Sequence, residues 1–267
     1  MRKSTIVIFW VLAIILTLTT SIYQRKTGPT NPKRTSININ NKDYKLSFPR
    51  SATSTNNTIT LNIAQPELKA QLIYRKYNQN EEFQTIEFEN NGQNLIANLP
   101  IQPPAGKLEY YIAIGQETLY QSDPLILRFK GDVPAGVLIP HIIFMFTSML
   151  FASYGLILAL GNKKNIGRYV LLTIITLIIG GFIFGPIVQK YAFGVYWSGF
   201  PLGYDLTDNK VLIALIILLT NLPFLKKKTL RYTAIIGFIA MIVVFSIPHS
   251  LRGSEFNHQT GKVETAR

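Results

Sequence analysis

The sequence predicts a membrane protein of the α+β class, with an N-terminal signal-anchor helix, an exported all-β sandwich and a C-terminal domain of four transmembrane helices. A mean hydropathy of +0.21 with 48% hydrophobic residues is too apolar for an ordinary soluble chain of 267 residues. The apolar residues gather in runs of about the 20 residues that cross a bilayer. Between the first and second runs the pattern instead alternates with period two, which is typical of strands.

The first apolar run predicts a signal anchor over residues 1–24. Arg2 and Lys3 precede an apolar stretch at 4–22 that is longer than the core of a usual secretory signal peptide. The residues after it contain no clear A-x-A cleavage site, so an uncleaved helix is favoured over a cleaved signal peptide. Residues 25–35, with Gly28, Pro29 and Pro32, form a polar linker.

Residues 36–131 predict a sandwich of seven or eight short strands. In the strand at 107–114, Leu108, Tyr110, Ile112 and Ile114 share one face, and Asn, Pro and Gly clusters separate the strands. The stretch 35–130 carries nine basic and nine acidic residues and is neutral. Because the overall charge of +13 therefore lies elsewhere, beside the apolar runs, it does not indicate a nucleic-acid partner.

Part of this region resembles a known family. Leu99, the Pro103-Pro104 and Gly106 turn, the Glu109-Tyr110 strand and Ser122-Asp123-Pro124 resemble the latter half of a fibronectin type III domain, an immunoglobulin-like sandwich. The resemblance implies a spacer or binding module and no chemistry. The layout as a whole resembles uncharacterised bacterial multi-span membrane proteins, to which no functional family is assigned.

A membrane domain is predicted at 136–248, with spans at about 136–160, 169–188, 208–225 and 232–247, an outer hairpin at 189–210 and an outer tail at 249–267. Between 142–160, 170–188, 211–225 and 233–247 there is no Asp, Glu, Lys, Arg or His. Proton-coupled transport and ion pumping need such groups inside the bilayer, so this emptiness argues against a transporter.

The distribution of charge predicts the orientation of the spans. With the N-terminus in the cytoplasm, the inner segments contain no acidic residue and nine basic ones, namely Arg2, Lys3, Lys163, Lys164, Arg168, Lys226, Lys227, Lys228 and Arg231. This asymmetry follows the positive-inside rule. It predicts a protein of the bacterial cytoplasmic membrane whose sandwich and C-terminus lie on the outer, periplasmic side.

Two histidines are candidate ligands for a cofactor or metal. His141 and His249 each end an Ile-Pro-His triplet at the outer end of a span, so the predicted topology puts them at one depth. With Asp205, Asp208 or Glu255 nearby, they could hold haem or a transition metal. The alternative, which is favoured, is that an amphipathic helix-end histidine lies in the headgroup zone. No cofactor is assigned.

The hairpin at 189–210 carries the other candidate residues. Asp205 and Asp208 could bind a metal or act as acid and base, but both stand just before a helix, where a carboxylate caps free amides. A set of aromatic residues is the candidate interaction surface, namely Tyr191, Tyr196, Trp197, Phe200 and Tyr204. An aromatic belt at the membrane interface is the alternative interpretation of these rings.

These patterns favour a non-enzymatic binding or accessory subunit of a cell-envelope complex, with the bilayer and an envelope protein as partners. The chain has no cysteine and matches no G-x-S-x-G, Walker A, H-E-x-x-H or dinucleotide-binding motif. A redox protein that binds haem or metal through His141 and His249 is the first alternative. A membrane enzyme that acts on a lipid or envelope substrate at the hairpin is the second.

Overall fold

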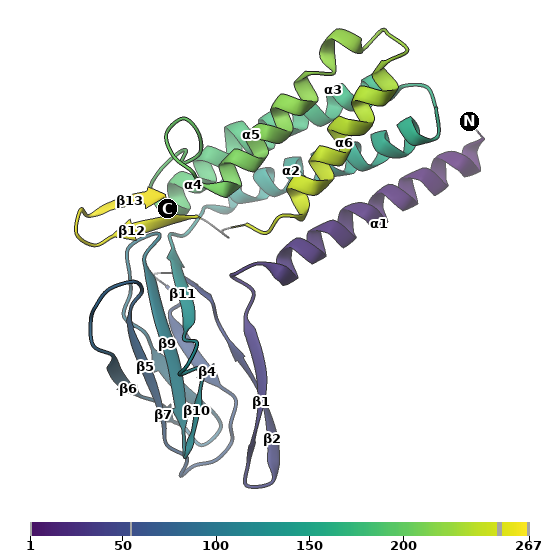
Figure 1. Ribbon diagram of the computed structural model, residues 1–267. Helices are drawn as coiled ribbons and strands as arrows, with labels where there is room; N and C mark the ends of the chain where they lie inside the picture. Colours follow the sequence, from purple (N-terminus) through teal and green to yellow (C-terminus); the bar gives the residue numbers. More distant parts are fainter. Residues whose placement is uncertain (1, 54, 250–252, 266–267) are drawn as a thin grey trace. The chain divides into compact units, whose positions relative to one another are not determined.

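The computed structural model describes residues 2–53, 55–249 and 253–265 (Figure 1). The chain divides into a helical unit, which contains Met1–Pro29 and Val133–Ser254, and a β unit, which contains Thr30–Asp132 and Glu255–Glu264. Residue 1 of the predicted anchor, residue 54 of the predicted sandwich and residues 250–252 and 266–267 of the predicted tail lie outside the described residues.

Apolar helices make up the helical unit. They are α1 (Lys3–Thr27), α2 (Ala135–Leu160), α3 (Ile166–Leu177), the π-helix η1 (Ile178–Phe184), α4 (Gly185–Phe193), α5 (Leu206–Leu219), the 3-10 turn η2 (Leu222–Phe224) and α6 (Leu230–Ser246). Among the described residues, four segments are long and apolar enough to cross a membrane, namely Lys3–Thr27, Ala135–Leu160, Ile166–Phe193 and Leu206–Phe224. The helix at the predicted fifth span, α6, has 17 residues and is shorter than these four.

Helix α1 packs into the helical unit through one face. The Trp10 ring stacks on Tyr154 of α2 at a centroid distance of 4.1 Å, and Tyr154 in turn lies 4.7 Å from Tyr169. The buried Thr17 hydroxyl donates to Ala13 O and also to Ser153 Oγ of α2, at 3.2 Å. The helix continues to Thr27, three residues beyond the predicted anchor, so the predicted linker was too long at this end.

Helix α2 is the centre of the unit and contacts α1, α3 and α6. At Gly155 an added side chain would meet the ring of the fully buried Phe238 of α6. Because Gly155 has no side chain, the ring of Phe238 packs directly over its backbone, and α2 and α6 can lie close together. The pattern of small and large residues therefore sets the spacing of α2 and α6.

We expect Gly155→Ala to destabilise the helical unit by about 1–3 kcal/mol, because the added methyl would lie within 2.7 Å of Phe238 Cε2 and would overpack the core. Thermal unfolding of the detergent-solubilised protein measures this. Gly136→Ala is the matched control, since that position is in the same helix with nothing within 4 Å of the added carbon. Equal melting temperatures for the two variants would contradict the packing described here.

The β unit is a sandwich. Its strands are β1 (Lys33–Ile39), β2 (Lys42–Phe48), β3 (Ser51–Thr53), β4 (Thr58–Leu61), β5 (Ala70–Lys76), β6 (Gln84–Glu87), β7 (Glu89–Asn90), β8 (Leu95–Asn98), β9 (Lys107–Ile114), β10 (Glu117–Leu119) and β11 (Leu125–Lys130). Among the described residues, one sheet has the order β3-β11-β9-β5-β6 with β10 on β9, and a second has the order β4-β8-β7. The hairpin β1-β2 contributes to the same core.

Strand β1 was not predicted. It begins at Lys33, inside the segment that the sequence suggested was linker, and pairs antiparallel with β2 from Lys33–Phe48 to Ile39–Lys42. Its sequence, KRTSINI, shows little of the alternation by which the other strands were recognised, and its burial pattern is mostly exposed. This segment is therefore a strand because it pairs with β2 in the folded chain, and its local sequence pattern does not indicate one.

The core of the β unit contains the alternating apolar residues that the sequence singled out. Leu108, Tyr110, Ile112 and Ile114 of β9 are all buried, and the intervening residues are partly exposed. The Tyr110 hydroxyl donates to Pro49 O at 2.7 Å, and burial raises the pKa of this hydroxyl above its ordinary value. In a tyrosine corner the acceptor lies a few residues upstream, whereas Pro49 lies 61 residues away in sequence.

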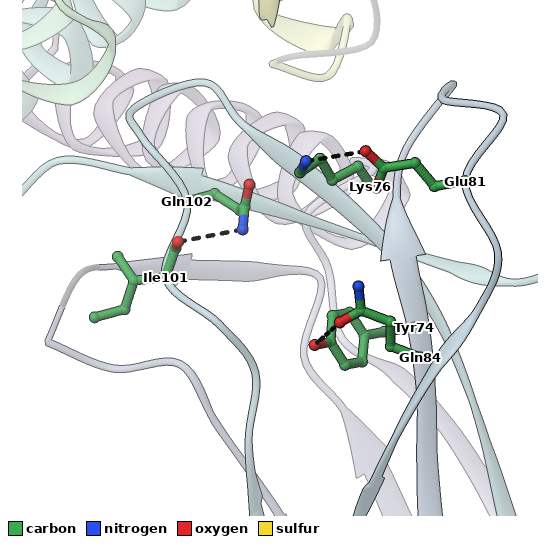
Figure 2. Close-up of polar contacts among 6 residues, drawn as sticks. All are labelled: Tyr74, Lys76, Glu81, Gln84, Ile101 and Gln102. Carbon is green, nitrogen blue, oxygen red and sulfur yellow. Dashed lines mark hydrogen bonds and ion pairs between the residues drawn. The ribbon is translucent and has the colours of Figure 1, made fainter. Parts of the chain in front are cut away.

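Side chains reinforce the hairpin formed by β5 and β6. Tyr74 Oη donates to Gln84 Oε1 at 2.7 Å across the pair, and Lys76 Nζ lies 3.0 Å from Glu81 Oε1 in the connecting loop (Figure 2). Gln102 Nε2 also donates to Ile101 O within its own loop (Figure 2). These contacts are exposed and order the surface of the sandwich.

The C-terminal segment is partly folded. Strands β12 (Ser254–Asn257) and β13 (Lys262–Thr265) form a hairpin, although the sequence suggested only a polar tail. Within the β unit, Phe256 N donates to Ala105 O at 3.1 Å and Glu255 Oε2 accepts from Lys107 Nζ at 2.7 Å. Glu255 is therefore engaged with Lys107.

Candidate functional site

The segment between α4 and α5, residues 194–205, is called the aromatic loop here. It contains neither helix nor strand and is shorter at both ends than the predicted hairpin 189–210, because α4 continues to Phe193 and α5 begins at Leu206. Gly194 ends α4 with φ of 83°, a left-handed conformation that suits glycine. The loop therefore begins and ends on rigid helices (Figure 1).

A buried polar cluster underlies the loop; its side chains are Gln189, Ser198, Asp205, Asp208 and Ser254. Gln189 Nε2 donates to Ser198 Oγ at 2.5 Å, and Ser254 Oγ donates to the same oxygen at 3.1 Å. Ser198, Asp205 and Ser254 are buried. The cluster thus joins α4, the loop, α5 and the segment after α6 through side-chain hydrogen bonds.

Asp205 is the N-cap of α5, as the sequence suggested. Its Oδ1 accepts from Thr207 N at 2.8 Å. Its Oδ2 accepts from Ser254 N at 3.1 Å and from Ser254 Oγ at 3.3 Å. The residue is only 5% exposed, so these donors replace water around the carboxylate. Both oxygens of Asp205 are therefore occupied by the fold.

Asp208 holds the loop against α5 and does not cap the helix. Its Oδ2 accepts from Ser198 N at 2.8 Å and from Ser198 Oγ at 3.2 Å. Gly199 passes so close to Asp208 that a side chain there would lie 2.6 Å from Asp208 Cβ. Next to it, Asn209 Oδ1 accepts from Phe200 N at 2.6 Å. The first turn of α5 therefore binds two successive parts of the loop.

The five aromatic residues of the predicted interaction surface differ in solvent exposure. Phe200 is 66% exposed and Tyr204 is 78% exposed, and Tyr191 and Tyr196 are also exposed. Trp197 is half-buried, because its ring stacks on Phe182 at 5.7 Å and its Nε1 donates to Phe200 O at 3.1 Å. Trp197 therefore supports the loop from beneath, while the other four rings are presented outward.

His141 lies in the second turn of α2, directly after Pro140. Its Nδ1 is 2.9 Å from Gly180 O, a carbonyl of the π-helix η1. Gly180 O also accepts from Gly185 N in the i to i+5 pattern of a π-helix, and such segments occur often at functional sites. If Nδ1 carries the proton, Nε2 is left as the unprotonated nitrogen of the ring.

His249 lies within electrostatic range of His141. The surrounding protein desolvates the His249 imidazole, and Lys210 and His141 lie near enough to oppose its protonation, so its pKa is lowered. The residue as a whole remains exposed, and water moderates this shift. His249 is therefore neutral at pH 7, which is the form that binds metals.

The helix end before His249 is fixed by two donors. Ile247 O accepts from Lys210 Nζ at 2.5 Å and from Gln24 Nε2 of α1 at 3.0 Å. Lys210 is buried, and Asp205 lies close enough for the opposite charges to attract. The ends of α1, α5 and α6 thus meet at this carbonyl, next to Pro248 and His249.

Within residues 2–53, 55–249 and 253–265, no group of three or more His, Asp or Glu residues could hold a metal ion. The two histidines lie within electrostatic range of each other, and Asp205, Asp208 and Glu255 are held by other partners. Ser198, Lys210 and Ser254 were not singled out from the sequence. The only signal for Lys210 was a basic residue at the apolar edge of a span, and serines carry no such signal.

We expect Asp208→Ala to loosen the aromatic loop, because it leaves the buried Ser198 amide without its acceptor at a cost of about 1–3 kcal/mol. Hydrogen exchange over residues 194–205 measures this. Asp208→Asn keeps an acceptor oxygen of similar shape and serves as the matched control, with a smaller expected change. Unaltered exchange in the alanine variant would show that the loop does not depend on this contact.

No family model, curated protein or solved structure matches this chain. Function therefore rests on the geometry of the site.

Proposed function

We propose that this protein is a non-enzymatic binding or accessory subunit of a cell-envelope complex, anchored in a bacterial cytoplasmic membrane. The observation that carries the proposal is the aromatic loop, where the three exposed rings of Tyr196, Phe200 and Tyr204 stand on a base of hydrogen bonds made by Asp205 and Asp208. Aromatic side chains dominate binding energy at protein interfaces. A loop that is already ordered loses little conformational entropy when a partner binds.

The direction of the helices supports an outer location for this surface. The aromatic loop and the basic turns occur at opposite ends of the helices that they connect, and the positive-inside rule assigns the basic ends to the cytoplasm (Figure 1). Chain topology then assigns the aromatic loop and the β unit to the outer side. The fibronectin III-like interpretation of the β unit fits a binding module.

Retention of α1 is part of the proposal. A cleaved signal peptide would have no reason to bury Ala13 and Thr17 against α2 or to stack Trp10 on Tyr154. The Gln24 amide also supplies one of the two donors to Ile247 O. These contacts favour an uncleaved signal anchor that belongs to the folded protein.

An enzyme acting at the loop is less well supported. Asp205 and Asp208 would be its carboxylates, but each accepts hydrogen bonds that hold the loop and the start of α5. A general acid or base must reach a substrate proton at hydrogen-bond distance. Carboxylates committed to the fold in this way are better suited to positioning the aromatic rings than to chemistry.

A photo-crosslinking amino acid placed at Tyr204 or Phe200 is expected to capture a discrete envelope protein in native membranes. The same residue at Tyr232 is the control, since Tyr232 is an exposed aromatic at the basic end of the helical unit. Replacing Tyr196, Phe200 and Tyr204 together with alanine should reduce co-purification of that partner by roughly tenfold or more. Crosslinks to lipid alone at all three positions would indicate an aromatic belt instead.

The histidine pair supports a second candidate function, a membrane redox protein that binds haem or a transition metal. The observation that supports this candidate is the contact between His141 Nδ1 and Gly180 O. Histidines that bind metals usually donate their second ring nitrogen to a carbonyl or carboxylate, which orients the free nitrogen. With His249 nearby and neutral, two imidazole ligands are available for a haem iron or for part of a metal site.

Haem and Cu²⁺ titrations of the purified protein, followed by absorption spectroscopy, test this second function. Binding should be lost when His141 and His249 are both changed to alanine and retained in His258→Ala, which removes the histidine of the β unit. Binding should also weaken as the pH falls, because protonated imidazole is no ligand. A protein that gives no spectral change with either titrant is not a haem or copper protein.

A further inference from the structure

The basic end of the helical unit contains a cavity that the proposed function does not use. It has a volume of about 790 Å³, within the usual range for ligand sites, and lies between the turn that joins α2 to α3 and the turn that joins α5 to α6. Six basic residues line it, namely Lys163, Arg168, Lys226, Lys227, Lys228 and Arg231. None of its described lining residues is acidic.

Two helices begin at this cavity. Ile166 and Gly167 of α3 line it, and so do Leu230 and Arg231 of α6. Neither α3 nor α6 has a side-chain hydrogen bond at its N-cap or an acidic residue in its first turn. The amides of a first helical turn carry partial positive charge and bind anions readily. The backbone therefore adds to the charge of the side chains.

Arg231 fixes one wall of the cavity. Its Nε donates to Ala159 O at 2.9 Å and its Nη2 donates to Leu160 O at 3.3 Å, which ties the start of α6 to the end of α2. Among the described residues, none of the six lining cations forms an ion pair with a carboxylate. Their charges are close together, and only an external anion would balance them.

We propose that this cavity binds the phosphate group of an anionic ligand. Lys226, Lys227, Lys228 and Arg168 are exposed around it and would contact the phosphate oxygens together with the amides at the start of α3. The phosphate could belong to an anionic phospholipid headgroup or to a soluble phosphate compound. Exposed apolar residues in the lining, such as Leu171 and Tyr232, offer a surface along which an acyl chain could lie.

The test uses the full chain in neutral detergent, with phosphatidylglycerol, phosphatidylcholine and inorganic pyrophosphate as separate probes at fixed ionic strength. Native mass spectrometry measures retained lipid, and calorimetry measures pyrophosphate binding. Arg168→Gln and Lys164→Gln form a matched pair, because both remove one positive charge and only Arg168 lines the cavity. The triple variant Lys226→Gln, Lys227→Gln, Lys228→Gln removes more of the lining charge.

Arg168→Gln should weaken binding roughly fivefold and the triple variant at least about tenfold, while Lys164→Gln stays near wild type. Retention of phosphatidylglycerol over phosphatidylcholine with this variant pattern identifies a lipid ligand. Pyrophosphate binding with the same pattern, without selective lipid retention, identifies a soluble ligand. The proposal is overturned if neither anion binds, or if Arg168→Gln and Lys164→Gln behave alike. Arg168→Gln decides the matter if the triple variant does not fold.

Discussion

Backbone groups at the ends of the helices need hydrogen-bond partners in surroundings that exclude water, and this constraint organises the helical unit. Lys210 and Gln24 donate hydrogen bonds to Ile247 O just after α6, and Arg231 donates one to Ala159 O near the end of α2. The imidazole of His141 adds a further hydrogen bond to Gly180 O in the π-helix, a carbonyl that also accepts from Gly185 N. Most polar side chains that looked like candidates for chemistry are thus partners of backbone groups.

The same constraint applies to the aromatic loop. In the loop that joins the apolar helices α4 and α5, the Asp208 carboxylate accepts from the amide of Ser198, whereas Asp205 accepts from Thr207 N in α5 and from Ser254 N after α6. Because both carboxylates are used in this way, the aromatic rings can be exposed while the backbone beneath them stays ordered. The unpaired cations at the other end of the helices have no such backbone role, Arg231 excepted. The two ends therefore differ in chemistry, one suited to an apolar partner and one to an anion.

Sequence patterns located the helices and most strands, but they erred where the hydropathy signal ends. Residues 189–193 are polar and aromatic, so they resembled a loop, although α4 continues through them to Phe193. Strand β1 lacks clear alternation and was taken for linker. The sequence offered both Asp205 and Asp208 as caps, and the structure shows the local capping contact at Asp205, with the acceptor and the donor two residues apart. For Asp208 the same reasoning was wrong, since its donor comes from the loop, ten residues earlier.

By itself, the sequence determined which segments are apolar, which turns are basic and where the neutral β region lies, because each of these depends on neighbours within a few positions. Only the tertiary structure decided which polar groups meet. Ser254 reaches Asp205 across 49 positions, His141 reaches Gly180 across 39, and Tyr110 reaches Pro49 across 61. Such pairs form because buried donors and acceptors must be satisfied wherever the packing of apolar surfaces places them, and local pattern carries no record of that placement.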